Sequence, residues 1–443
     1  MGFKKGFLWG GGVSAGQCEG SFEGDGKGRA IREPENFHEP AVDFYHHYPE
    51  DIRLFQELGM KAFRTSIDWS RIYPDPWGEA NQIGIDYYRD LFEKLNEAGI
   101  TPIVTLSHGG DPYPLKQIGE WSSKETIDLF MKYVRTCYEK FGDLIPYWLT
   151  FNEVNCGPAV AGRGFGGEPP QPYDFVYNAL HNRLVAGAKA TVLLHEMYPE
   201  SRMGNMLGYF AIYPKTCNPK DNIKCMQKTN VLHHICGEVQ VYGEYPYFVK
   251  SFFKEHDVNL NITDEEREVL KKGTVDFVSI SYYCSDVISH LEDRPIVSGN
   301  LVGGVDNEFL EKNGWGWHID PEGFRWVLND CYQRYKKPIA VVENGLGSFD
   351  TLEDGKVHDD YRIQFLKDNI GQMKVAVEDG VDVFAYCMWS PIDIVAASVK
   401  TVKKRYGVIY VDVDDEGNGT FNRYKKDSFD YYRHVIETNG EDL

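Results

Sequence analysis

The sequence predicts an α/β fold, a (β/α)8 barrel, on the basis of three observations. Short apolar runs alternate with amphipathic stretches along the whole chain. Most of these runs are continuously apolar, which is typical of parallel strands that are buried on both faces. There are eight of them, the number of strands that closes such a barrel. The predicted strands are Phe7–Gly12, Ala62–Ile67, Thr101–Leu106, Tyr147–Phe151, Arg202–Leu207, Asp276–Tyr282, Pro338–Val342 and Val381–Trp389.

The amphipathic stretches between these runs predict helices. Gly59 and Gly99 each end a helix shortly before the next strand, because glycine readily adopts the left-handed conformation of a helix end. Ser122–Glu125 has the form of a capping box and is followed by apolar residues at helical spacing. Later helices are predicted over Asp174–Tyr198, Pro321–Tyr335 and Asp359–Val377.

We expect one domain over residues 1–443, a TIM barrel with long loops after its strands, at the face where this fold gathers catalytic residues. A doubly wound sheet is the alternative. It would normally carry a glycine-rich nucleotide turn, but Gly10–Gly12 fits neither GxGxxG nor GxxxxGK[ST]. Near the end of the chain, Gly407–Tyr410 and Thr420–Tyr424 predict a hairpin.

Composition argues against several classes of partner. The chain has 47 basic and 67 acidic residues and a net charge of −20, which disfavours nucleic acid and an anionic membrane surface. No apolar run is long enough to span a bilayer, and none of signal-peptide length follows Met1–Gly6. The nine cysteines show no CxxC pair and are typical of reduced thiols. We therefore expect a cytoplasmic protein, and the choice between monomer and homo-oligomer stays open.

No metal site or cofactor is expected. The adjacent pairs His46-His47 and His233-His234 lack the spacing of metal ligands, and no HExxH motif occurs. The acidic turn of the predicted hairpin fails the calcium-loop pattern, because its twelfth position is Arg423. Catalysis would then depend on side chains and water alone.

Two glutamates carry the strongest functional signal. Glu153 lies just past the predicted strand Tyr147–Phe151, and Glu343 lies just past Ile339–Val342. Two carboxyl groups at the ends of buried strands can face each other across one site. Cleavage of a glycosidic bond needs such a pair, because one group protonates the leaving oxygen while the other attacks or activates water.

An ordered set of segments extends this signal over nearly the whole chain. The segments are Phe7–Gly10, Gln17–Gly20, Asp25–Gly28, Phe63–Ile72, Thr150–Glu153, Glu343–Gly345 and Arg405–Gly407. In residue type and order they resemble glycoside hydrolase family 1, the retaining β-glycosidases. The resemblance implies a (β/α)8 barrel, a small-molecule β-glycoside as substrate and no cofactor.

The resemblance also implies roles for the two glutamates and their neighbours. Glu153 would be the general acid/base, and Glu343 the nucleophile that forms a covalent glycosyl-enzyme. A retaining enzyme places its two carboxyl groups about 5–5.5 Å apart, and ionised Glu343 would raise the pKa of Glu153. Arg64 would supply the counter-charge of Glu343, Tyr283 would donate to it, and Asn152 would hold the 2-hydroxyl of the sugar.

Three further residues match the family's sugar-binding positions. Gln17 and His108 match residues that bind ring hydroxyls, and Trp389 matches the platform under the sugar. Taken alone, His108 would more often be a satisfied interior histidine, Trp389 a core residue and Arg64 part of a structural ion pair. Only the family pattern favours the functional interpretation of each.

The segment after the eighth strand indicates a phosphorylated sugar. Ala396 and Ala397 stand where relatives that act on free glucosides carry a Glu-Trp pair, whose carboxylate would repel a 6-phosphate. Ser398, Lys404 and Tyr406 have the spacing that the 6-phospho-β-glucosidase branch uses to hold the phosphate. The cations in this segment, on a chain of net charge −20, are Lys400, Lys403, Lys404 and Arg405.

Several alternatives stay open at this point. The basic run could be a solvated turn, and the enzyme an unphosphorylated β-glucosidase or β-galactosidase with the same glutamates. A catalytically inactive sugar-binding protein is a remote alternative, because such relatives lose one catalytic glutamate and this chain keeps both. The sequence leaves open the gluco or galacto configuration and the aglycone. His108 is followed by Gly109-Gly110, where the family usually has an aromatic residue.

Overall fold

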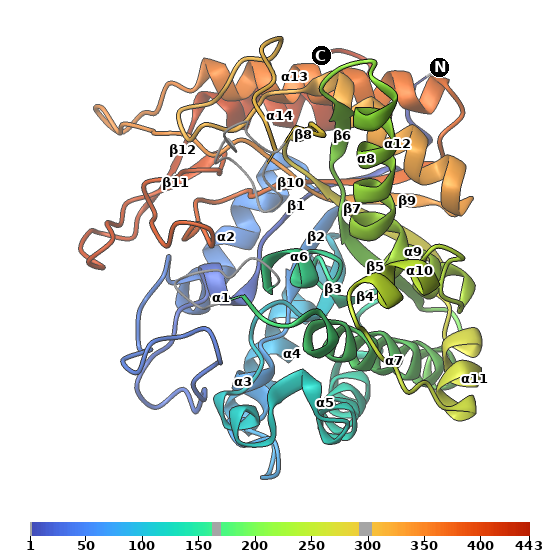
Figure 1. Cartoon of the computed structure of the whole chain (residues 1–443). Coiled ribbons are helices and arrows are strands. Elements are labelled where there is room, and N and C mark those ends of the chain that lie inside the picture. Colours follow the sequence, from blue (N-terminus) through green and yellow to red (C-terminus); the bar gives the residue numbers. More distant parts are fainter. Residues whose placement is uncertain (1, 162–169, 292–303) are drawn as a thin grey trace.

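The computed structural model describes residues 2–161, 170–291 and 304–443. Eight parallel strands close into a barrel in the order β1-β10-β9-β7-β5-β4-β3-β2, with helices around it (Figure 1). This confirms the predicted (β/α)8 fold, and no strand end differs from its prediction by more than two residues. The barrel strands are β1 (Leu8–Gly12), β2 (Ala62–Ser66), β3 (Thr101–Ser107), β4 (Tyr147–Phe151), β5 (Arg202–Gly208), β7 (Phe277–Tyr282), β9 (Ile339–Asn344) and β10 (Val383–Trp389).

The helices follow the strands in sequence and cover the outside of the barrel. The three predicted helices Asp174–Tyr198, Pro321–Tyr335 and Asp359–Val377 correspond to α7, α12 and α13, with ends displaced by one residue at most. The helices are α1 (Ala15–Cys18), α2 (Phe44–Leu58), α3 (Trp69–Ile72), α4 (Gln82–Glu97), α5 (Glu125–Phe141), α6 (Cys156–Ala161), α7 (Tyr173–Met197), α8 (Pro219–Thr229), α9 (Ile235–Tyr242), α10 (Val249–Glu255), α11 (Asp264–Lys272), α12 (Pro321–Tyr335), α13 (Asp360–Glu378) and α14 (Asp427–Glu437).

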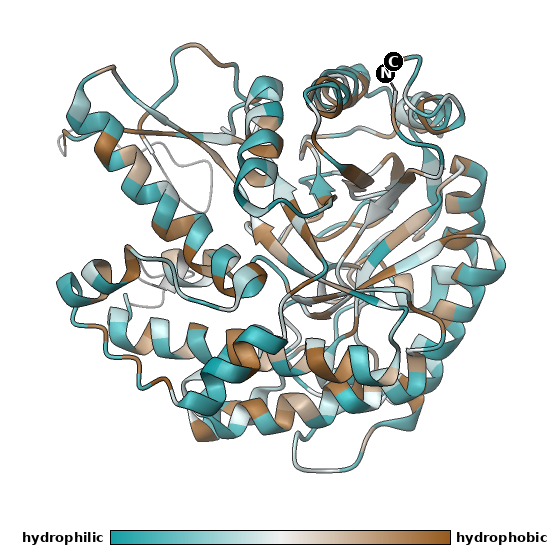
Figure 2. Cartoon of the chain, turned by 90° about the vertical axis from the view of Figure 1, so that its right-hand side faces the viewer, coloured by the Kyte–Doolittle hydropathy of each residue, from teal (hydrophilic) through white to brown (hydrophobic). Residues whose placement is uncertain are grey.

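Two hydrophobic layers hold the barrel together. The interior is filled by a cluster that takes small or apolar residues from seven strands, such as Ala62, Leu149, Met206, Phe277 and Val342. A larger cluster lies between the strands and the helices. Figure 2 shows the corresponding pattern, with hydrophilic residues on the outer surfaces of the helices. Because both faces of each strand are buried, the strands read as continuous apolar runs.

Four short strands lie outside the barrel. β6 (Ala211–Pro214) and β8 (Ser285–Ile288) form a parallel pair beyond β5 and β7, which the sequence patterns did not predict. β11 (Ile409–Val411) and β12 (Arg423–Lys425) form the predicted antiparallel hairpin, slightly displaced along the chain.

The predicted capping box is wrong. The helix α5 begins at Glu125, but Ser122 Oγ donates to the Gly119 carbonyl instead of capping it. The Glu125 carboxylate accepts from Trp77 Nε1 at 2.9 Å. A complete capping box occurs elsewhere, at Thr263 and Glu266, where it opens α11.

The last helix closes the barrel against the first strand. Tyr432 Oη in α14 donates to the Gly10 carbonyl of β1 at 2.7 Å. Arg423 of β12 forms a buried ion pair with Asp51 of α2 at 2.8 Å. Asn439 Nδ2 donates to the Phe3 carbonyl, so the two ends of the described chain lie side by side (Figure 2).

Two further predictions concern the thiols and the apolar helices. None of the nine cysteines, all of which lie in the described ranges, forms a disulfide, and only Cys217 is exposed. Within the described ranges, no helix combines the length and the apolar character needed to cross a bilayer.

Candidate active site

The predicted catalytic residues meet at one edge of the barrel. Parallel strands in a barrel all end at the same edge, so side chains at the ends of different strands converge there. Glu153 follows the end of β4, Glu343 is the second-last residue of β9, and Arg64 lies in β2. Tyr283 follows β7, and Trp389 is the last residue of β10.

Glu343 is buried and held at both carboxylate oxygens. Its Oε1 accepts from Arg64 Nη1 at 2.6 Å, and its Oε2 accepts from the Tyr283 hydroxyl at 2.7 Å. Burial raises the pKa of Glu343, while the charge of Arg64 and the Tyr283 hydrogen bond oppose that rise. The two donors therefore favour the ionised form and fix the direction of the carboxylate.

Glu153 has a different environment. Its Oε1 accepts from Ser281 Oγ at 2.5 Å, and its backbone N–H donates to Met206 Sδ at 3.2 Å. Its φ of 41° lies in the left-handed region, which is uncommon for a residue other than glycine. Burial, followed by the charge of Glu343, raises the pKa of Glu153 to about 7. Glu343 thus accepts hydrogen bonds from two donors, whereas Glu153 retains a proton near neutral pH.

Arg64 connects the two catalytic segments. Its buried guanidinium donates to Glu343 Oε1, to Asn152 Oδ1 at 2.7 Å and to Thr105 Oγ1 at 3.0 Å. Because Arg64 occupies the amide oxygen of Asn152, the Asn152 amino group is left to meet a ligand. Arg64 therefore forms an ion pair, and the partner in that pair is the candidate nucleophile Glu343.

His108 and Trp389 lie close together beside Arg64. Their ring centroids are 6.1 Å apart, and the Arg64 guanidinium lies 5.8 Å from the Trp389 ring centroid. Burial, together with the charges of Arg64 and Arg32, holds the pKa of His108 well below its ordinary value. The imidazole is therefore neutral at pH 7, and its buried Nδ1 has no hydrogen-bond partner among the described residues. Such an atom is available to a hydroxyl group.

Gln17 is bonded within the protein. Ser14 Oγ donates to Gln17 Oε1 at 2.8 Å, and Gln17 Nε2 donates to the Val395 carbonyl at 2.7 Å. These bonds tie the segment after β1 to the loop after β10. Its role in binding a sugar hydroxyl stays a prediction.

The two glycines after His108 differ in their surroundings. Gly109 has φ +89°, and a Cβ built there would have no heavy atom within 4 Å. A Cβ on Gly110 would approach Asp68 Oδ1 to 2.6 Å. The position where the family usually has an aromatic residue thus faces open space.

Lys404 is the one buried residue among the four cations of its segment that shows no acidic partner in the described chain. Its side chain is only 1% exposed, and Nζ lies 3.6 Å from the Trp317 ring centroid. Trp315 and Tyr406 also flank Nζ, at 5.5 and 5.6 Å. Burial lowers the pKa of Lys404 to about 8. Three aromatic rings thus surround the Lys404 ammonium group, and no carboxylate of the described residues pairs with it.

The other cations of the segment are engaged or solvated. Arg405 pairs with Asp393 at 3.2 Å, and Lys403 pairs with Asp415 at 3.3 Å. Lys400 is exposed. The basic run therefore holds a single buried cation without an acidic partner among the described residues, in a turn whose other cations are ion-paired or solvated.

Tyr406 links the Lys404 surroundings to the nucleophile. The centroid of the Tyr283 ring lies 6.5 Å from that of Tyr406 and 5.8 Å from that of Trp317. Tyr283 donates to Glu343, so two aromatic residues in succession, Tyr406 or Trp317 and then Tyr283, lie between Lys404 and the Glu343 carboxylate. Ser398 is different: it lies on an exposed turn, and no hydrogen bond joins its side chain to Lys404. Its predicted contact with phosphate stays a prediction.

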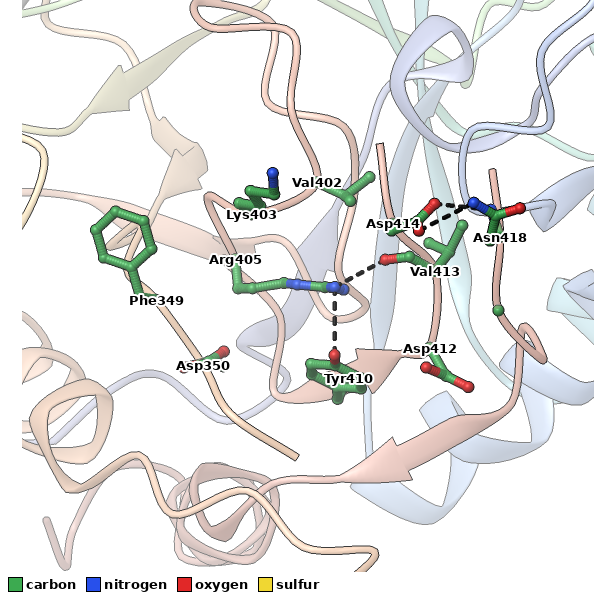
Figure 3. A pocket seen from close by; sticks show the side chains of 11 residues that line it. Phe349, Asp350, Val402, Lys403, Arg405, Tyr410, Asp412, Val413, Asp414 and Asn418 are labelled. Atoms are coloured by element: carbon green, nitrogen blue, oxygen red, sulfur yellow. Dashed lines mark hydrogen bonds between the residues drawn. The ribbon is translucent and has the colours of Figure 1, made fainter. Parts of the chain in front are cut away.

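Lys403 and Arg405, the sequence neighbours of Lys404, line a pocket of about 490 Å³ (Figure 3). Arg405 crosses it and donates to the Val413 carbonyl at 2.9 Å and towards Tyr410 Oη at 3.4 Å. Phe349 lines the pocket and stacks on Trp315, with ring centroids 4.7 Å apart. The polar groups here bond to one another, so the pocket belongs to the framework that fixes the turn carrying Lys404.

Sequence reasoning missed the contacts of three residues. Ser281, Trp315 and Trp317 were not among the predicted site residues. The structure places Ser281 on Glu153 and both tryptophans around Lys404. No local sequence pattern could have assigned these contacts, because the partners lie far away in the sequence.

Comparison with known proteins decides the family. Residues 1–441 match the model of Glycosyl hydrolase family 1. The chain belongs to this family. It is therefore a glycoside hydrolase, and the match covers the barrel and the catalytic segments together.

The relatives of this glycoside hydrolase include named phospho-glucosidases. It is 41% identical to the aryl-phospho-beta-D-glucosidase BglH of Bacillus subtilis, over 100% of this chain and 98% of the relative. It is also 41% identical to a 6-phospho-beta-glucosidase of Dickeya chrysanthemi, over 99% of this chain and 98% of the relative. Among solved structures, the family 1 β-glucosidase of Thermotoga maritima matches with a TM-score of 0.87 and 31% identity, over 100% and 99% of the two chains.

Proposed function

We propose that this family 1 enzyme hydrolyses 6-phospho-β-glucosides with retention of configuration at the anomeric carbon. The observation that carries the proposal is Lys404, a buried ammonium group without an acidic partner among the described residues. A buried, unpaired charge is costly, and a phosphate dianion would offset that cost with charge-assisted hydrogen bonds.

Two further observations support a phosphorylated substrate. Ala396 and Ala397 leave no carboxylate at the position where free-glucoside enzymes grip the sugar. Several relatives at about two-fifths identity, such as that of Dickeya chrysanthemi, are named for phosphorylated glucosides, whereas the Thermotoga maritima beta-glucosidase A is 34% identical. Phosphorylated sugars are retained inside cells, so we also propose a cytoplasmic location.

The proposed reaction has two steps. In the first, Glu343 attacks the anomeric carbon while Glu153 gives its proton to the departing glycosidic oxygen. Loss of the charge on Glu343 then lowers the pKa of Glu153, which removes a proton from water in the second step. That water attacks the anomeric carbon and releases Glu343 as a carboxylate. The expected separation of about 5–5.5 Å between the two carboxyl groups stays a prediction.

The neighbouring side chains have supporting roles in this proposal. Arg64 and Tyr283 keep Glu343 ionised and aimed, because each occupies one of its oxygens. The free amino group of Asn152 and the neutral imidazole of His108 suit sugar hydroxyls, and Trp389 provides an aromatic face. Tyr406 would complete the phosphate site with Lys404.

A direct comparison of two substrates tests the proposal. The value of kcat/KM should be much higher for p-nitrophenyl β-glucoside 6-phosphate than for the unphosphorylated compound. Equal or faster hydrolysis of the free glucoside would instead support an ordinary β-glucosidase with the same catalytic pair. The galactoside 6-phosphate, measured in parallel, decides between gluco and galacto configurations.

A further inference from the structure

Ser281 occupies a position in the barrel wall between the two catalytic segments. It lies in β7 and is 2% exposed. Its register partner in β5 is Gly208, and its register partner in β9 is Glu343, next to an irregularity between Ile280 and Ser281. The backbone of Ser281 is thus paired beside one catalytic carboxylate while its hydroxyl group is bonded to the other.

The carboxyl group of Glu153 lies against this wall. Ser281 Oγ donates to Glu153 Oε1 at 2.5 Å. On the other side, a Cβ on Gly208 would come within 3.2 Å of Glu153 Oε1 and 2.5 Å of Cys156 Sγ. A hydroxyl group and a residue without a side chain together define the space in which this oxygen sits.

We propose that Ser281 is the positioning residue of the proton donor, an inference that rests on the proposed role of Glu153. Because Oε1 accepts from Ser281, the proton that Glu153 transfers resides on Oε2, the oxygen left to face the leaving group. In the second step the same hydroxyl donates to the newly ionised carboxylate and stabilises it as a base.

Other groups also act on Glu153 and must be separated from Ser281. Burial and the charge of Glu343 raise the pKa of Glu153, whereas the Ser281 hydrogen bond lowers it. Removing the hydroxyl therefore moves the pKa upward. The other titratable groups that interact with Glu153 are Arg64, Arg32, Cys156 and Tyr283.

The test uses leaving groups of different quality. A poor leaving group such as phenol needs the proton of Glu153, whereas 2,4-dinitrophenol departs without it. On 6-phospho-β-glucosides of the two, Ser281→Ala should lower kcat/KM about ten- to a hundredfold for the phenyl compound and less than about threefold for the dinitrophenyl compound. The alkaline limb of its pH profile should move to higher pH.

The chain offers a matched control on the same strand. Ser279 is also a buried serine of β7, and its hydroxyl donates to the Asn205 carbonyl, away from both carboxylates. Ser279→Ala should change kcat/KM by the same factor for both substrates and leave the pH profile unchanged. Ser281→Thr keeps a hydroxyl group and should restore much of the activity on the phenyl compound, which also covers the case in which Ser281→Ala folds poorly.

Equal losses of kcat/KM on the two substrates in Ser281→Ala would overturn the proposal. An alkaline limb that does not move in Ser281→Ala, together with no rescue by Ser281→Thr, would overturn it as well. Glu153→Gln separates this failure from failure of the proposed function. That variant should itself lose activity mainly on the phenyl compound. If it does not, Glu153 is not the proton donor, whatever Ser281 does.

Discussion

At the scale of single residues, the two glutamates show how position in a fold makes identical side chains different. Glu343 has a donor on each oxygen, and both donors favour its charge. Glu153 has one hydroxyl donor and lies within the electrostatic influence of Glu343. Burial raises the pKa of both, but Arg64 and Tyr283 oppose the rise at Glu343, whereas the charge of Glu343 adds to it at Glu153. A nucleophile and an acid can therefore arise from one residue type.

The nucleophile can be tested by removing it. Glu343→Gly should lower hydrolysis by about 10⁴-fold or more, because no other group can form the covalent intermediate. Azide or formate, small enough to enter the space left by the side chain, should restore part of the activity and give a product of inverted configuration. Undiminished hydrolysis in this variant would remove Glu343 from the mechanism.

The proton donor predicts a pH profile. Glu153 must be protonated in the first step, and its pKa is about 7. The value of kcat/KM should therefore fall as the pH rises above about 7. The residual activity of Glu153→Gln on the phenyl substrate should lack this alkaline limb. An unchanged limb would assign it to a different group.

The phosphate site is tested by neighbouring lysines. Lys404→Ala should raise KM for a phosphorylated glucoside about ten- to a hundredfold, through loss of a charge-assisted hydrogen bond, and change KM for the free glucoside little. Lys403→Ala is the matched control, because Lys403 is exposed and pairs with Asp415. Equal effects of Lys404→Ala on both substrates would leave the basic run without a binding role.

The sequence made the two glutamates visible because each comes shortly after an apolar run. Family resemblance supplied Arg64 and Tyr283, and the structure brings both to Glu343. The bond between Ser281 and Glu153 joins residues 128 positions apart, so no local pattern contains it. The same holds for the tryptophans around Lys404. Contacts that depend on strand register are set by the closed barrel and not by spacing along the chain.

At the scale of elements, continuous apolar runs located every barrel strand, because both faces of each are buried. The capping box failed for a different reason. The sequence pattern was suitable, but the Glu125 carboxylate is bonded to Trp77, which comes from another part of the chain. The β6–β8 pair was missed because two short strands beyond the barrel carry little periodic signal.

A buried ionic network anchors the turn that carries Lys404. Asp393 accepts from Lys426 at 2.8 Å and pairs with Arg405, and all three side chains are almost wholly buried. Removing one member leaves buried charges without partners. The network therefore contributes to placing Lys404 as well as to stability.

We expect Asp393→Ala to lower the free energy of unfolding by about 3 to 5 kcal/mol in urea titrations. Asp379→Ala is the control, because it breaks an exposed pair with Arg325 and should cost less than about 1 kcal/mol. Similar small losses in both variants would show that the Asp393 network does not carry this share of stability.

At the scale of the whole molecule, the barrel depends on contacts between the two ends of the chain. The hydroxyl of Tyr432 in the last helix is bonded to the Gly10 carbonyl of the first strand. Together with the Arg423–Asp51 pair, it holds the closing segments on the amino-terminal strands and helices. These closing contacts thus join residues that are far apart in the sequence.

Tyr432→Phe should lower the free energy of unfolding by about 1 to 2 kcal/mol, because it leaves the buried Gly10 carbonyl without this donor. Tyr431→Phe, on the same helix, removes a buried hydroxyl that has no partner among the described residues, and should be neutral or slightly stabilising. Urea unfolding of both variants checks the difference. A larger loss in Tyr431→Phe would contradict the assignment.

The unneutralised ammonium of Lys404 has a calorimetric consequence. Its pKa is about 8, so a growing fraction is uncharged as the solution becomes alkaline. A bound dianion favours the charged form, and association above pH 8 must draw protons from the medium. The apparent heat of association would then vary with the ionisation enthalpy of the buffer. The affinity for the dianion would weaken as the pH rises.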